Sequence, residues 1–246
     1  METATLDTVR TRHGTFLIDR VQDKKMAQAL HSSAYPNENL IEVARHFVNT
    51  ESIVVDIGAH IGTFAIPLAT QVRKVIAFEP SPEHFTLLSR NAVANDIHLQ
   101  SVNKALGSVE GRGALVARNA SNAGTNTLVA GDTTTISTLD AEVTHADFIK
   151  IDVEGMELDV LCGGTKLIER AQPVILFEVH LSQLRAHGVS PRALEKFFME
   201  RGYQLYLPLE HTNGELARVR SITLLTAFIA PRAWFCFSES APFDLV

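Results

Sequence analysis

Cysteine is scarce in this chain of 246 residues, which contains only Cys162 and Cys236. The two lie far apart in the sequence, so neither has the spacing of a metal-ligand pair. Disulfides persist mainly in oxidising compartments. We therefore expect both cysteines to be reduced, buried side chains of a cytoplasmic protein.

An excess of positive charge and a long apolar run are also missing. Lysine and arginine number 22 against 28 aspartates and glutamates, which gives a net charge of −6 and argues against a nucleic-acid partner. The longest apolar stretch near the C-terminus is cut by Pro231 and Arg232 and is too short to span a bilayer. Charged residues within the first twelve leave no apolar core for a signal peptide. We expect no membrane partner, and the apolar C-terminal runs leave a homo-oligomer open.

Short apolar runs alternate with helical patterns over most of the chain. Expected strands lie at residues 15–18, 53–57, 74–78, 97–103, 148–151 and 173–179, with later runs at 203–207, 222–229 and 233–237 able to close a sheet. Expected helices lie at 23–30, 39–48, 63–70, 81–94, 156–161 and 191–201. This alternation predicts an α/β fold with a doubly wound, mostly parallel sheet, for which we expect seven strands. Ligands of such sheets bind at the carboxyl ends of the strands.

Two regions depart from the alternation. Residues 1–50 form a helical and hairpin N-terminal segment, in which Asn37 is expected to cap the helix at 39–48. Residues 108–138 are rich in glycine, asparagine, serine and threonine. We interpret them as an insertion of extra strands and loops between the third and fourth strands, within one domain at 51–246.

The most informative stretch is the glycine turn, defined here as Asp56–Gly62, which follows the strand at 53–57. Its spacing is D-x-G-x-x-x-G, whereas dinucleotide enzymes have G-x-G-x-x-G. Glu79 ends the next strand about 20 residues later, where Rossmann-like folds place an acid on ribose hydroxyls. Asp56 would repel a pyrophosphate but suits the ammonium and sulfonium of S-adenosylmethionine. These residues favour S-adenosylmethionine over NAD, and a dehydrogenase is the disfavoured alternative.

Three further strings complete a known pattern. They are Phe78-Glu79-Pro80-Ser81-Pro82, Ile149-Lys150-Ile151-Asp152-Val153-Glu154-Gly155-Met156-Glu157, and Phe177-Glu178. Together with the glycine turn, and with Thr138-Leu139-Asp140 before the second string, they make residues 35–180 resemble the FkbM-type S-adenosylmethionine-dependent methyltransferases. The resemblance implies a Rossmann-like methyltransferase sheet and methyl transfer, usually to oxygen on a small molecule, sugar or natural product.

The resemblance also implies which residues hold the cofactor. Gly58, His60 and Gly62 would line its methionine part, and Glu79 with Pro80 its ribose. The turn that contains Lys104, Ala105 and Leu106 would form the adenine edge, although it lacks the acid that many methyltransferases have there. Tyr35 and Glu38 resemble a segment that folds over the cofactor, and a surface turn at Pro36 is the alternative.

Four residues are candidates for the chemistry, namely Asp152, Glu154, Glu178 and His180. Asp152 and Glu178 end strands that should be adjacent, which would bring their carboxylates close together near the cofactor. An alkyl hydroxyl needs a base or a cation to remove its proton. His180 is a candidate base, and Asp152, Glu154 and Glu178 are oxygen ligands of the kind that Mg²⁺ prefers. N-methylation of a small molecule and non-catalytic binding of S-adenosylmethionine remain the alternatives.

Overall fold

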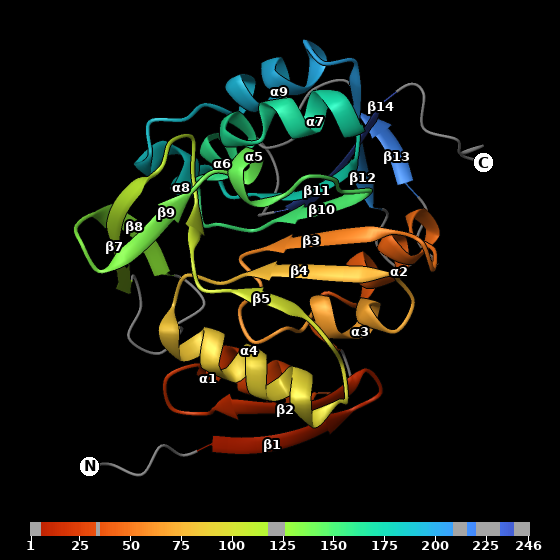
Figure 1. The fold of residues 1–246 in the computed structure, drawn as a ribbon, viewed down its shortest axis with the longest axis vertical. Helices are drawn as coiled ribbons and strands as arrows, with labels where there is room; N and C mark the ends of the chain where they lie inside the picture. Colours follow the sequence, from red (N-terminus) through yellow and green to blue (C-terminus); the bar gives the residue numbers. More distant parts are fainter. Residues whose placement is uncertain (1–5, 33–34, 118–125, 209–215, 220–231, 239–246) are drawn as a thin grey trace.

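The computed structural model describes residues 6–32, 35–117, 126–208, 216–219 and 232–238. Its centre is a twisted eight-stranded sheet with helices on both faces (Figure 1). Five parallel strands run in the order β5 (Gln100–Val102), β4 (Lys74–Phe78), β3 (Ile53–Ile57), β10 (Phe148–Ile151) and β11 (Val174–Val179). The strands β14 (Arg232–Ser238), β12 (Tyr203–Pro208) and β13 (Leu216–Val219) follow, each antiparallel to the strand before it.

The parallel strands are buried on both faces, which explains their nearly continuous apolar sequences. Val54 faces one core cluster and Val55 the other, because successive side chains point to opposite sides of a sheet. The strand order reverses between β3 and β10, since β4 lies on one side of β3 and β10 on the other. Such a reversal opens a crevice at the carboxyl ends of the strands.

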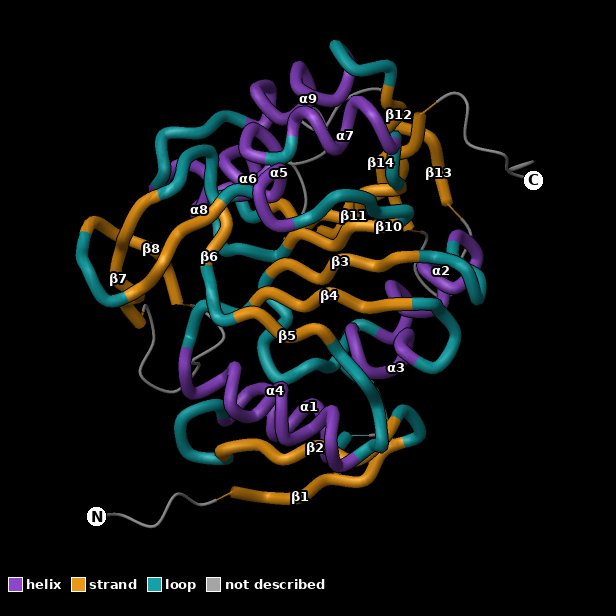
Figure 2. Tube along the Cα trace, viewed as in Figure 1, coloured by secondary structure: helices purple, strands orange, loops and turns teal. Residues whose placement is uncertain are grey.

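The helices form two layers, one for each core cluster (Figure 2). One layer holds α1 (Lys24–His31), α2 (Glu38–Phe47), α3 (Ala65–Ala69) and α4 (Pro82–Ala94). The other holds α5 (Leu139–Glu142), α6 (Glu157–Gly163), α7 (Thr165–Ala171), α8 (Leu181–Ala186) and α9 (Pro191–Met199). Ser81 caps α4 through its side chain and Pro82 follows at the first helical position, as the sequence predicts.

An N-terminal hairpin of β1 (Leu6–Thr11) and β2 (Gly14–Asp19) packs along α4. The side-chain amides of Asn91, in α4, and of Asn95, directly after it, hold the hairpin to this helix. Asn91 accepts from the amide N–H of Leu17 at 2.7 Å and donates to its carbonyl at 3.2 Å, and Asn95 pairs in the same way with Thr15. Helix α1 follows the hairpin. Asp23 is its N-cap residue, and the Asp23 carboxylate accepts a hydrogen bond from the backbone amide of Met26.

A second, four-stranded sheet lies beside the carboxyl ends of β3 and β4 (Figure 1). Its strands run in the order β6 (Ala105–Leu106), β9 (Thr134–Ser137), β7 (Gly111–Ala117) and β8 (Asn126–Ala130). All of them come from the chain between β5 and β10. This small sheet forms one wall of the crevice.

Several expectations need correction. The main sheet has eight strands where seven were expected, because β13 adds an antiparallel edge. The strand expected at 97–103 is shortened to β5, and the run at 222–229 lies outside the described residues. Asn37 precedes α2 in the left-handed conformation and makes no side-chain cap.

The expected burial of cysteine is wrong for Cys162, which is exposed because it lies on the face of α6 opposite the buried Val160 and Leu161. The side chain of Cys236 lies outside what the structure describes. Among the described residues, no helix is both long and apolar enough to cross a membrane.

Candidate functional site

A cavity of about 370 Å³ opens at the carboxyl ends of β3, β4, β10 and β11. Its volume falls in the range of small-molecule sites. The small sheet contributes Leu106, Leu115 and Leu128 to its wall, and α1 contributes Met26 from the N-terminal segment. The charged and titratable side chains on the wall are Asp23, Lys25, His60, Glu79, His84, Lys150, Asp152, Glu154 and Glu178.

The glycine turn is held to β4 by its own backbone. The amides of Gly58 and Ala59 both donate to the carbonyl of Phe78 at 3.0 Å. Gly58 has φ +80, and a Cβ there would lie 1.9 Å from the carbonyl oxygen of Asp152. A Cβ on Gly62 would contact Ile66 and Leu88. Close packing therefore requires these glycines. Of the three residues expected along the methionine part of the cofactor, Gly58 and His60 line the cavity, whereas Gly62 does not.

Glu79 is fixed where the sequence predicts a ribose ligand. One carboxylate oxygen accepts from the amide of His60 and the other from the amide of Ser81, both at 2.8 Å. The side chain is 6% exposed and lies on the cavity wall. Because a carboxylate has about four lone-pair sites, the two amides orient Glu79 and still leave acceptors for a diol.

Asp56 lies beneath the cavity, not on its wall. It is fully buried and stands directly opposite Lys150 in the β3–β10 ladder, with Nζ 3.4 Å from Oδ1. Burial raises the pKa of Asp56 and Lys150 opposes this shift. Burial also opposes the charged form of Lys150, yet Asp152, 3.2 Å away, and Asp56 together raise the pKa of its ammonium.

This ion pair changes the argument that favoured S-adenosylmethionine. The charge of Asp56 is compensated by Lys150, so its repulsion of a phosphate is weaker than the sequence suggested. Lys150 was not among the predicted site residues. Its signal was a lysine inside the buried apolar strand Phe148–Ile151, which is costly without an acidic partner.

Glu154 has the most perturbed carboxyl group on the cavity wall. Its backbone is left-handed, with φ +58, and its carboxylate accepts from the side-chain amide of Gln183. Burial first, and then the charge of Asp152, raises the pKa of Glu154 to about 7. A carboxyl group with such a pKa exchanges protons near neutral pH and is suited to general base catalysis.

Glu178 and His180 form a pair at the end of β11. Nε2 of His180 lies 3.0 Å from Oε1 of Glu178, and this hydrogen bond raises the pKa of His180. Strands β10 and β11 are adjacent, as predicted, and both Asp152 and Glu178 line the cavity. His180 itself does not line the cavity and contacts Glu178, which does.

Three predicted cofactor contacts lie elsewhere. The hydroxyl of Tyr35 donates to the carbonyl of Thr63 at 2.9 Å, inside the core. Glu38 pairs with Arg12 and His13, and Lys104 pairs with Glu142 at 2.6 Å. Pro80, Ala105 and Leu106 do line the cavity. The side chains of Tyr35, Glu38 and Lys104 do not line the cavity.

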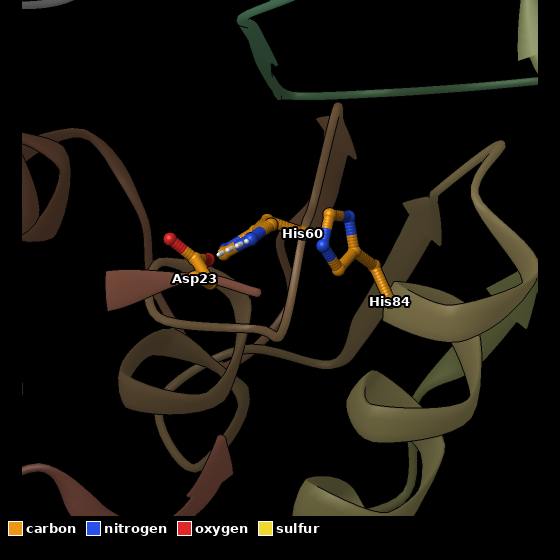
Figure 3. Close-up of side chains that lie close together, drawn as sticks. All are labelled: Asp23, His60 and His84. Carbon is orange, nitrogen blue, oxygen red and sulfur yellow. Dashed lines mark ion pairs between the residues drawn. The ribbon is translucent and has the colours of Figure 1, made fainter. Parts of the chain in front are cut away.

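The proposed magnesium ligands are not grouped as a metal site in the described part of the chain, where the one such cluster is Asp23, His60 and His84 (Figure 3). Sequence reasoning missed Asp23 and His84, which look locally like an ordinary helix cap and a first-turn residue. Only the fold brings them to the glycine turn.

Comparison with known proteins identifies the family. A family model described as "Methyltransferase FkbM domain" matches residues 56–205, more than half of the chain. The chain belongs to the FkbM methyltransferase family. This FkbM methyltransferase is 29% identical over 174 residues to the hexuronic acid methyltransferase AglP of Haloferax volcanii, and the match covers 66% of this chain and 68% of that relative.

Solved structures share the fold at low identity. The FkbM methyltransferase of Methylobacillus flagellatus KT matches with TM-score 0.50 and 17% identity, over 77% of this chain and 44% of that chain. The present chain therefore spans less than half of that structure. An rRNA methylase of Streptococcus thermophilus (TM-score 0.51, 14% identity) and SMU.1697c of Streptococcus mutans with SAH (TM-score 0.50, 13% identity) match over 84% of this chain. They cover 98% and 99% of those chains.

Proposed function

We propose that this FkbM methyltransferase binds S-adenosylmethionine in the cavity and methylates an oxygen of a small acceptor. The observation that carries the proposal is the acidic wall at the strand ends. Glu79, Asp152, Glu154 and Glu178 all line one cavity, and their charges suit the ammonium and sulfonium of the cofactor. When bound, the cofactor supplies the electrophilic methyl group, so the protein mainly positions the nucleophile.

The residues have separate roles in this proposal. Glu79, oriented by two amides, binds the ribose diol, and Ala105 with Leu106 covers the adenine edge. Asp152 is ion-paired with Lys150 and acts as a binding group. Glu154 faces the cavity with a pKa of about 7 and would take the proton from the acceptor hydroxyl as the oxygen–methyl bond forms and the methyl–sulfur bond breaks, which leaves S-adenosylhomocysteine. Glu178, held by His180, positions the acceptor.

A sugar or sugar acid is the proposed acceptor class, because the relative AglP is a hexuronic acid methyltransferase. A small-molecule acceptor also agrees with the net charge of −6, which does not favour a nucleic acid. N-methylation differs only in the nucleophile and is the second candidate. A labelled-methyl transfer assay against neutral sugars, hexuronates, phenols and amines, run with and without a chelator, separates these acceptors.

Glu154→Gln tests the base. We expect kcat, measured at saturating cofactor, to fall by about 10²–10⁴-fold, the usual range for loss of general acid–base catalysis. In the wild type the carboxylate is the active form, so kcat should rise as pH increases through about 7 and then level off. The variant should lose this rise.

The matched control is Glu157→Gln. Burial raises the pKa of Glu157 to about 7 as well, but Glu157 does not line the cavity. This control should keep its turnover and pH profile. Wild-type turnover in Glu154→Gln, or an equal loss in Glu157→Gln, would remove Glu154 from the mechanism. Cofactor binding without turnover of any acceptor would favour a non-catalytic binding protein.

A further inference from the structure

Asp23, His60 and His84 come from three separate elements and meet at one point of the cavity wall (Figure 3). Asp23 starts α1, His60 lies in the glycine turn, and His84 lies in the first turn of α4. One potential ligand atom from each residue lies within 4.8 Å of the others. The imidazole ring centroids of His60 and His84 are 4.3 Å apart, and the rings meet edge to face.

Several polar atoms of this cluster are buried and lack well-aligned hydrogen bonds. Asp23 is 4% exposed, and its Oδ2 lies 2.7 Å from Nε2 of His60. These two atoms form an ion pair without an aligned hydrogen bond, and Nδ1 of His60 has no hydrogen-bond partner (Figure 3). A buried carboxylate or imidazole without an aligned partner is costly. The unaligned pair and the unpartnered Nδ1 therefore point to an additional ligand at this cluster.

The charges and donor types indicate what that ligand is. The second carboxylate oxygen of Asp23 accepts from the amide of Met26, which fixes the orientation of the group. Oε1 of Glu79 lies 3.8 Å from Nδ1 of His84, so two carboxylates adjoin the two imidazoles. Imidazole nitrogen suits zinc and related transition metals, whereas Mg²⁺ prefers oxygen alone.

We propose that Asp23, His60 and His84 bind a divalent transition-metal ion, with zinc the best match to the donor set. Three protein ligands leave one position open, as in zinc sites that bind a water or a substrate. Because all three residues line the cavity, this open position is available to an oxygen donor of a molecule bound there. Zinc bonds of about 2.0–2.1 Å require the imidazoles to rotate inward on binding.

The test measures metal binding and does not depend on methyl transfer. The full chain, stripped with a chelator and dialysed, is titrated with CoCl₂ alone and followed by the visible absorption of tetrahedral cobalt, then back-titrated with ZnCl₂. We expect one ion per chain, displacement of cobalt by zinc, and no displacement by MgCl₂. Absence of stoichiometric cobalt and zinc binding would overturn the proposal, and so would displacement of cobalt by magnesium.

Two variants and one control locate the ion. Asp23→Asn removes the charge but preserves an oxygen that can cap α1, and His84→Ala removes an imidazole. Each should weaken binding by more than about 100-fold, since loss of even an outer-shell partner costs 10–100-fold. His98→Ala, which removes an exposed histidine, should bind as the wild type does.

A thermal melt of each variant shows whether it is folded. If His84→Ala does not fold, metal binding by Asp23→Asn tests the site. Binding within about threefold of the wild type in a folded ligand variant would refute the site. An equal loss in His98→Ala would refute it too, because it would indicate general surface binding.

Discussion

Lys150 is the residue on which the buried charge of the site depends. It is 5% exposed and lies between Asp56 and Asp152. We expect Lys150→Met to destabilise the protein by about 3–5 kcal/mol, because it leaves the Asp56 carboxylate buried without a counter-charge. Urea denaturation measures this loss, and exposed Lys166→Met is the control, with a change below about 0.5 kcal/mol.

A second substitution, at the ion-pair partner Asp56, separates the effect of charge from the effect of packing. Adding Asp56→Asn to Lys150→Met removes the uncompensated charge and should recover part of the loss. The Lys150→Met defect should also shrink at acidic pH, where Asp56 is protonated. An equal loss at every pH, with no recovery in the double variant, would show that packing of the lysine stem causes the effect.

Glu157 should make the free energy of unfolding depend on pH, and its raised pKa predicts the direction of the change. Burial raises its pKa from 4.5 to about 7. The unfolded chain therefore releases this proton at lower pH than the folded chain, and the stability associated with Glu157 falls as pH rises from about 4.5 to 7. Glu157→Gln should match the wild type near pH 4 and exceed it near pH 8. Denaturant midpoints measured across this range check the sign, and Glu110→Gln, at an exposed position, should give a constant difference.

Among the elements, α4 has the most unusual role because its side chains hold the N-terminal hairpin. Asn91 is fully buried and bonds to Leu17 and to the carbonyl of Ile61. We expect Asn91→Ala to cost about 2–4 kcal/mol, since it leaves several buried backbone groups unpaired at about 1–3 kcal/mol each. Val93→Ala, at a residue 80% exposed on the same helix, should change the free energy of unfolding by less than about 0.5 kcal/mol.

The central strands could be predicted from sequence because burial on both faces leaves a nearly continuous apolar run, as in Ile53–Ile57, which only Asp56 interrupts, and in residues 75–78. Strand β5 could not be bounded in this way, since Gln100 is exposed and Ser101 and Val102 are only half-buried. The strands of the N-terminal hairpin are even less evident from the sequence. Strand β1 carries Thr8, Arg10 and Thr11 among its apolar residues, and only its pairing with β2 orders it.

The candidate site was predicted where local motifs carry it, and it was missed where distant residues meet. Glu79 and Asp152 follow strands whose carboxyl ends share one edge, so their position followed from the strand pattern. Tyr35 and Lys104 were misplaced because a motif does not determine which way a long side chain points. Asp23 and His84 lie 61 positions apart in the sequence, and no local pattern joins them.

At the scale of the whole molecule, ligand binding should stabilise the fold. S-adenosylhomocysteine at about 100 times its Kd should add about 2.7 kcal/mol, which for a chain of this size raises Tm by about 5–11 °C. Thermal unfolding followed by circular dichroism measures the shift. NAD at the same concentration should leave Tm unchanged, and an equal shift with NAD would contradict the cofactor assignment.

The join between α4 and the hairpin has a consequence for how this part of the fold can vary. The hydrogen bonds between two paired strands do not depend on side-chain identity, because the backbone makes them. Here Asn91 and Asn95 supply both the donors and the acceptors. A single substitution at Asn91 or Asn95 therefore removes the donor and the acceptor for one hairpin residue together, whereas the hairpin's own sequence is constrained chiefly at the buried Val9, Phe16 and Ile18.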